Sequence, residues 1–119
     1  MNIRPATIHD VPAVQAIINS HAELGKMLFK SLAQLYENLR DFAVCEIDGK
    51  VVGCVALAVI WSDLAEVRSL AVQDGWQGRG IGRRLVELAV QESGARVVTV
   101  ACPAGAKFPQ YIHRVTRRQ

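Results

Sequence analysis

The segment 42–61 constrains the fold more than any other part of the chain. Two apolar runs, 42–47 and 50–61, flank Asp48-Gly49, the dipeptide most typical of a tight β-hairpin. The second run is apolar on both faces, which favours a central position in a sheet. The sequence therefore predicts a sheet built outward from this hairpin.

A third strand is predicted over 64–72, after a short turn. Regular alternation gives this strand two faces, one carrying Glu66, Arg68 and Leu70 and the other carrying Val67, Ser69 and Ala71. Two shorter strands are predicted near the ends of the folded region, over 2–6 and 96–101.

Apolar residues at helical spacing predict three helices, over about 9–21, 32–40 and 81–93. Ser31 is placed to cap the second helix. That helix would bury Leu32, Leu35 and Leu39.

The length and composition indicate one folded domain. The chain has 119 residues, of which 50% are hydrophobic and 21% charged, a balance typical of globular proteins. The longest apolar run, 51–61, is far shorter than the roughly 20 residues of a membrane helix, and the polar start carries no signal sequence. We therefore expect a cytoplasmic protein with no membrane partner.

The net charge of +3 is a weak indication of nucleic-acid binding. All the acidic residues precede Pro103, so the first part of the chain is nearly neutral and the excess of positive charge comes from the tail. Solvated basic tails are common, and no aromatic residues are interleaved with a basic surface. We expect no nucleic-acid partner.

The three cysteines, Cys45, Cys54 and Cys102, form no paired motif. In the predicted hairpin Cys45 opposes Val52, which makes Cys54 a diagonal neighbour on the same face, too distant for an unstrained disulfide. We expect buried free thiols and no metal site.

The glycine-rich stretch 77–84, QGRGIGRR, precedes the third predicted helix. Glycines let backbone amides approach an anion, and the positive end of the helix adds to that attraction. A phosphate-binding P-loop would need a lysine that this stretch lacks, and the dinucleotide fingerprint would need a glycine in place of Arg83. A solvated glycine-rich turn is the simpler alternative.

The spacing that does fit is Gln-x-x-Gly-x-Gly over 77–82, between a strand and an amphipathic helix. It resembles the acetyl-CoA motif of the GNAT superfamily of N-acetyltransferases, and the order of predicted elements resembles that fold. The stretches IRPATIHDV, AELGKMLFKS and LYENLRDFAV are similar to amino-acid N-acetyltransferases of the N-acetylglutamate synthase type. The resemblance implies an α+β fold of three α-β-α layers around a mixed, mostly antiparallel sheet, with a domain over 1–101.

The resemblance implies acetyl-CoA as co-substrate, with no metal. The pantetheine arm would pair with the backbone of Leu70 and Val72, where the strand splays from the one after the helix. The residues implied to bind the cofactor are Leu70, Ala71, Val72, Gln77, Gly78, Arg79, Gly80, Ile81, Gly82 and Arg83. Arg84 would add positive charge nearby.

Glu66 matches the position at which many members of the superfamily carry a general base. It would take the proton of the attacking amine, directly or through water, and a strand amide near Leu70 would face the oxyanion. The alternative is a structural ion pair between Glu66 and Arg68.

The acceptor implied by the narrower resemblance is glutamate or a related amino acid, a small-molecule amine whose carboxylates need cations. The candidates are Lys30, Arg68 and Lys26. Two alternatives stay open: another amine, such as a protein N-terminus or a polyamine, and a CoA-binding module without turnover.

The tail 102–119 departs from the resemblance. It contains Tyr111, but it lacks the Gly-Phe pair and the closing hairpin of the family, so the fold is expected to be C-terminally incomplete and to leave a sheet edge exposed. A partner chain in a homodimer, an impaired enzyme or a frameshifted end would each account for this departure.

Overall fold

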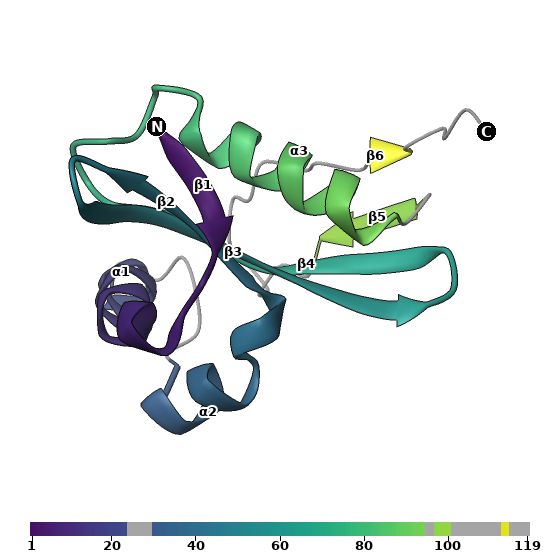
Figure 1. Ribbon diagram of the computed structural model, residues 1–119, viewed down its shortest axis with the longest axis horizontal. Coiled ribbons are helices and arrows are strands. Elements are labelled where there is room, and N and C mark those ends of the chain that lie inside the picture. Colours follow the sequence, from purple (N-terminus) through teal and green to yellow (C-terminus); the bar gives the residue numbers. More distant parts are fainter. Residues whose placement is uncertain (24–29, 95–96, 101–112, 115–119) are drawn as a thin grey trace.

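The computed structural model describes residues 1–23, 30–94, 97–100 and 113–114. A six-stranded sheet in the order β1-β2-β3-β4-β5-β6 forms its centre (Figure 1). The strands are β1 (Asn2–Pro5), β2 (Phe42–Ile47), β3 (Lys50–Trp61), β4 (Leu64–Val72), β5 (Val97–Val100) and β6 (His113–Arg114). The helices are α1 (Val11–Glu23), α2 (Leu32–Glu37) and α3 (Ile81–Ser93), with single 3-10 turns η1 (Ile8–Asp10) and η2 (Leu39–Asp41).

The helices cover both faces of the sheet, α1 and α2 on one side and α3 on the other (Figure 1). Each face has its own apolar core. One core joins Leu85 and Val86 of α3 to the sheet, and the other joins Ile18 of α1 and Leu35 of α2 to it. Within the described strands, β4 and β5 are the only pair that runs parallel. Among the described residues, the predicted three-layer α+β fold with a mixed, mostly antiparallel sheet is therefore confirmed.

The Asp48-Gly49 hairpin forms as predicted. Both residues take positive φ, 52° and 75°, the backbone of the tight turn that joins right-twisted strands. The register differs from a plain hairpin, because Val52 is an extra residue and Cys45 pairs with Gly53. Cys45 therefore packs on the α3 side and Cys54 on the α1 side, so the expected same-face arrangement is wrong. Both are buried free thiols, as predicted.

Ser31 caps α2 as predicted, and its hydroxyl accepts a hydrogen bond from the Gln34 amide at 3.2 Å. The helix ends at Glu37, earlier than expected, and η2 continues the chain into β2. Leu35 is buried, but Leu32 is 42% exposed, so its predicted burial is wrong. Such a short helix docks through one central side chain, and Leu32 lies at its first, outer turn.

β6 is a short closing strand that the sequence did not indicate. His113 and Arg114 pair antiparallel with Val98 and Val97, so the edge of β5 is covered at these positions. The fold is C-terminally incomplete in the described residues, as expected, because this strand has only 2 residues. Cys102 and Tyr111 lie outside the described residues. The division of the chain at residue 101 stays a prediction.

Candidate active site

β4 is paired along its whole length on one edge and along only part of the other. β3 covers the first edge, whereas β5 pairs with Leu64–Val67. From Arg68 to Val72, no described strand lies on the second edge. This half of β4 therefore presents backbone groups that an extended ligand could pair with.

A β-bulge at Arg68 exchanges the two faces of β4. Ser69 opposes Ala56 and Val67 opposes Leu57, so Arg68 has no opposite residue on β3. Ala56 and Ala71 pack on the α1–α2 side, whereas Leu57 and Val67 pack on the α3 side.

The predicted faces of β4 are therefore wrong. Glu66 and Leu70 lie on opposite faces of the sheet, and Ser69 lies on the same face as Glu66. Regular alternation would have put Ser69 on the α3 side, because it ignores the extra residue. The bulge thus gives the α1–α2 face a carboxylate and a hydroxyl three positions apart.

The glycine-rich loop ends at the start of α3, beside the end of β4. Gly78 and Gly80 have φ of 78° and 79°, and Gly80 is the N-cap residue of the helix. The Arg84 amide donates to the Gly80 carbonyl at 3.0 Å, so the amides of residues 81–83 precede the first helical hydrogen bond. The Gln77 side chain donates to the Val72 carbonyl at 3.2 Å and ties this loop to the strand.

The residues predicted to bind a cofactor form one continuous surface. A Cβ on Gly82 would lie 3.7 Å from the Val72 side chain and 3.9 Å from that of Leu70, so the first turn of α3 faces these two residues. Ile81 is buried in the core below, and its contribution to this surface is its backbone amide. Ala71 is also buried, on the opposite face, and contributes only backbone.

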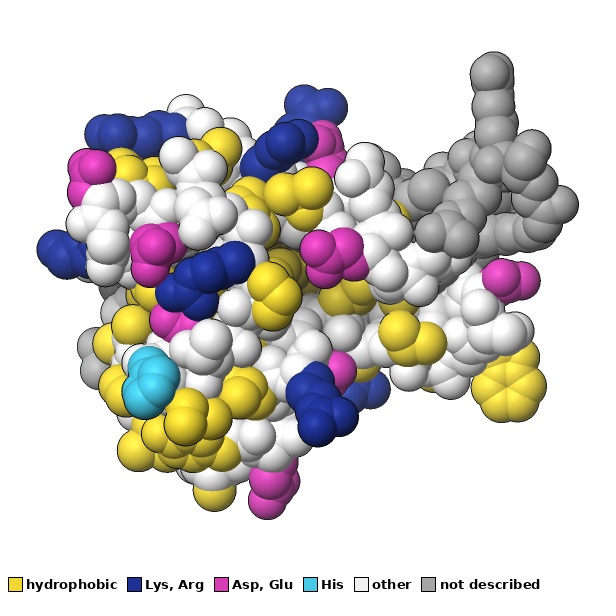
Figure 2. Space-filling model, in the orientation of Figure 1, with side chains coloured by type: hydrophobic (Ala, Val, Ile, Leu, Met, Phe, Trp, Pro, Cys, Tyr) yellow, Lys and Arg dark blue, Asp and Glu magenta, His cyan; other side chains and the backbone are white. Residues whose placement is uncertain are grey.

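Positive side chains lie on the loop and the helix that form this surface. Figure 2 shows Lys and Arg side chains along the upper edge of the molecule, over the loop before α3 and over α3 itself. The Arg79 guanidinium lies 4.8 Å from the centre of the Trp76 ring, which holds it against the loop. Arg83 pairs with Glu87 at 3.0 Å and is 73% exposed. Arg79 therefore packs against the loop, and Arg83 is partly neutralised.

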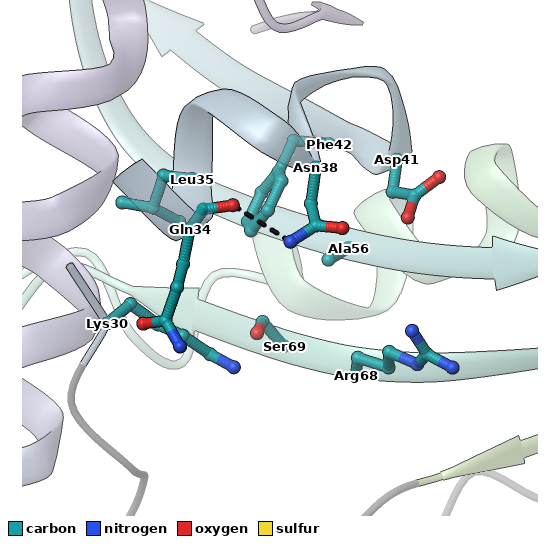
Figure 3. A pocket seen from close by; sticks show the side chains of 9 residues that line it. All are labelled: Lys30, Gln34, Leu35, Asn38, Asp41, Phe42, Ala56, Arg68 and Ser69. Atoms are coloured by element: carbon teal, nitrogen blue, oxygen red, sulfur yellow. Dashed lines mark hydrogen bonds between the residues drawn. The ribbon is translucent and has the colours of Figure 1, made fainter. Parts of the chain in front are cut away.

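A pocket lies between α2 and β4, on the face that carries Glu66 (Figure 3). It holds about 420 Å³ of empty space, including its open mouth. Its lining residues are Lys30, Gln34, Leu35, Asn38, Asp41, Phe42, Ala56, Arg68 and Ser69.

Two of the three cations predicted for the acceptor, Lys30 and Arg68, line this pocket; Lys26 lies outside the described residues. The backbone of Lys30 is held in place by α1, because its amide donates to Asn19 Oδ1 at 3.0 Å. No sequence pattern predicts the polar lining residues Gln34, Asn38 and Asp41. These residues follow Ser31 on α2, on η2 and between them. The capping serine is the one sequence feature that marks this segment.

Glu66 and Arg68 form an ion pair, with 2.9 Å between Nε and Oε1. The structural ion pair, which was the alternative role for Glu66, is thus present. It uses Nε of Arg68, so the two terminal nitrogens of the guanidinium group take no part in it. Glu66 is 27% exposed and reaches the surface beside the pocket. An ion pair and a role in proton transfer are compatible, because the pair holds the carboxylate in place.

Two negative findings concern the described part of the chain alone. It contains no group of three His, Cys, Asp or Glu side chains placed to hold a metal ion. Its helices are all too short or too polar to cross a membrane.

These features are an unpaired strand edge beside a glycine-rich helix start on one side of β4, and a small polar pocket on the other. The model of the acetyltransferase (GNAT) family matches residues 14–104, and the chain belongs to this family. It is 44% identical over 93 residues to an amino-acid acetyltransferase of Mycobacterium tuberculosis, covering 75% of this chain and 52% of that protein. It is 41% identical over 101 residues to an uncharacterized N-acetyltransferase of Chlorobaculum tepidum, covering 82% and 65%.

Solved structures give the same result. A Mycobacterium tuberculosis protein in complex with CoA and NLQ matches with a TM-score of 0.78 at 39% identity, over 87% of this chain and 66% of that one. The N-acetylglutamate synthase of Neisseria gonorrhoeae, complexed with coenzyme A and N-acetyl-glutamate, matches with a TM-score of 0.80 at 29% identity, over 87% and 25%. The chain thus spans about half to two thirds of its first curated relatives and a quarter of the synthase.

Proposed function

We propose that the chain is an acetyl-CoA-dependent N-acetyltransferase whose acceptor is the amine of a small amino acid, glutamate or a close relative. One observation carries the proposal. The unpaired half of β4 and the start of α3 meet at Leu70, Val72 and Gly82, while Glu66 stands on the opposite face of the same strand beside a cationic pocket.

The residues present fit the cofactor. The amides at the start of α3 and the glycines before it form an anion site for a pyrophosphate, and Arg79 adds charge. The β4 backbone from Leu70 to Val72 offers hydrogen bonds to an extended amide-bearing chain such as pantetheine. Acetyl-CoA supplies the acetyl thioester when it is bound there.

Glu66 is the proposed general base. An amine is protonated at neutral pH and becomes a nucleophile only when a nearby group accepts its proton. Glu66 Oε1 is held by Arg68, and Oε2 is not part of that contact, so it is the oxygen proposed to accept the proton. The strand amide near Leu70 is proposed to stabilise the negative charge that develops on the thioester oxygen.

The acceptor is proposed to bind in the pocket between α2 and β4. Lys30 and Arg68 give it two positive groups, which suits a ligand that carries carboxylates as well as an amine. Two of the most similar proteins are named for an amino-acid or glutamate acceptor, which supports the same assignment. Asp41 in the same lining favours a second candidate, a more cationic amine such as a polyamine or a protein N-terminus.

Calorimetric titration with acetyl-CoA, followed by a thiol-release assay with different acceptors, tests this function. We expect acetyl-CoA binding and thiol release with glutamate that exceeds release with spermidine or an N-terminal peptide. Faster release with a carboxylate-free amine would favour the second candidate. Binding without release under any condition would indicate a CoA-binding module, and lack of binding would contradict the proposal.

We further propose that the protein works in the cytoplasm, in arginine biosynthesis, as a homodimer. The apolar tip of the β3–β4 hairpin supports association, because Val59, Ile60 and Trp61 are exposed and Trp61 is 75% exposed. Light scattering coupled to gel filtration is expected to give twice the mass of one chain. A Trp61→Ser variant tests whether this tip takes part.

A further inference from the structure

Ser69 stands out on the pocket face of β4 as a buried polar residue with no evident structural use. It is 1% exposed, and among the described residues its side chain makes no hydrogen bond. In this part of the chain no side-chain oxygen is sealed off without a partner, so the Ser69 hydroxyl opens into the pocket that the residue lines. A hydroxyl that opens into a pocket and makes no hydrogen bond with the described residues is available to a bound ligand.

The β-bulge at Arg68 is what brings this hydroxyl to the pocket. Without the extra residue, Ser69 would point into the apolar core under α3, where Leu57 and Val67 pack. With it, Ser69 shares a face with Glu66. Bulges of this kind commonly redirect a side chain toward a functional site.

Ser69 lies between the two cations of the pocket. Figure 3 shows it along β4 between Lys30 and Arg68, with Asp41 on the far side of the pocket, on η2. An ammonium group at this point would be repelled by Lys30 and, to a smaller extent, by Arg68, whose charge Glu66 partly neutralises. A carboxylate would be attracted by both cations and would find in the hydroxyl a third donor, of fixed direction because the side chain is short and buried.

We propose that Ser69 is a specificity-determining residue whose hydroxyl donates a hydrogen bond to a carboxylate of the acceptor, shared with Lys30 and Arg68. The inference rests on the proposed function for its substrate. Ser69 would favour an acceptor that carries a carboxylate at this position over one that carries a neutral group there.

The test compares the wild-type chain with Ser69→Ala, which removes the hydroxyl, and Ser69→Thr, which keeps it. The probes are glutamate, glutamine and isoglutamine, so that each carboxylate is replaced in turn by an amide. Steady-state kinetics gives KM and kcat for each probe. Calorimetric titration of the same probes into the CoA-saturated chain gives binding without any need for turnover.

We expect Ser69→Ala to raise KM and Kd for glutamate about tenfold or more, the usual weight of a hydrogen bond to a charged group. KM for acetyl-CoA should stay within about twofold, and Ser69→Thr should recover part of the loss. Either glutamine or isoglutamine should bind equally well to wild type and to Ser69→Ala. That probe lacks the carboxylate to which Ser69 donates, so the result identifies this carboxylate. Because the hydroxyl makes no hydrogen bond within the described part of the chain, Ser69→Ala should be at least as heat-stable as wild type.

Unchanged glutamate binding in Ser69→Ala would overturn the inference, as would an equal loss for all three probes. A lower melting temperature with no change in binding would show a structural role instead. Absence of thiol release in the wild type, together with Ser69-dependent glutamate binding, would contradict the proposed function and support this inference. A wild-type chain that binds none of the probes would overturn it.

Discussion

The substitution Gly80→Ala tests how much the left-handed backbone of the loop before α3 contributes to stability, independently of side-chain packing. Gly80 has φ of 79° and ψ of 8°, a left-handed conformation that costs a residue with a Cβ about 1–2 kcal/mol. A Cβ there would meet nothing within 4 Å, so no steric clash adds to this cost. Alanine also lowers the conformational entropy of the unfolded chain, which stabilises the folded variant by about 0.4–1 kcal/mol.

The net loss is therefore about 1 kcal/mol, which corresponds to a fall in Tm of roughly 4 °C for a domain of this size. Gly82→Ala is the matched control, because it adds the same methyl two residues later. Gly82 lies within α3, and its Cβ would make only ordinary contacts at 3.7 Å or more. Alanine is better than glycine in a helix by about 0.5–1 kcal/mol, so this variant should be the more stable one.

Urea unfolding followed by circular dichroism measures both variants. We expect a difference of about 1.5–2 kcal/mol in the free energy of unfolding between them, with Gly80→Ala the less stable. Equal stability of the two variants would mean that the loop relaxes freely, and the argument that this backbone is built for an anion would lose its basis.

Three further predictions concern stability and reactivity. The hydrogen bond from Arg4 lowers the pKa of Asp10 to about 2, so the folded state binds fewer protons than the unfolded state below pH 4. The free energy of unfolding should therefore fall by roughly 2 kcal/mol from pH 5 to pH 2, and less in Asp10→Asn. Ser31→Ala should cost about 1 kcal/mol through loss of the α2 cap, measured by thermal unfolding. Burial raises the pKa of the Cys54 thiol to about 12, so Cys54 should resist alkylation at pH 8 in the native state and react in denaturant.

The layered fold could be predicted from the sequence because its signals are local. Asp48-Gly49 strongly favours a tight turn, and both residues take the positive φ of such a turn. The helix α3 follows from the helical spacing of its apolar residues, among them Leu85, which is buried. Each of these features depends on neighbours within one turn or one hairpin.

The faces of β4 could not be predicted, because they depend on pairing with another strand. Nothing near Arg68 in the sequence marks it as an extra residue, and the register with β3 alone reveals the bulge. Regular alternation places Ser69 on the wrong face for that reason. Of the polar residues that line the pocket, the sequence predicts only Lys30 and Arg68. The β5–β6 contact was missed because a pair of residues carries no periodicity.

Glu66 is proposed to accept the proton of an acceptor amine beside acetyl-CoA bound at the start of α3. The most direct test of this role is kcat for Glu66→Gln, measured by thiol release together with the Kd for acetyl-CoA. Glu92→Gln on α3, outside the pocket between α2 and β4, is the control and should behave as wild type. We predict that Glu66→Gln leaves the Kd nearly unchanged and lowers kcat by about 10²–10⁴-fold. A Glu66→Gln variant with the kcat of wild type would show that Glu66 is not the general base.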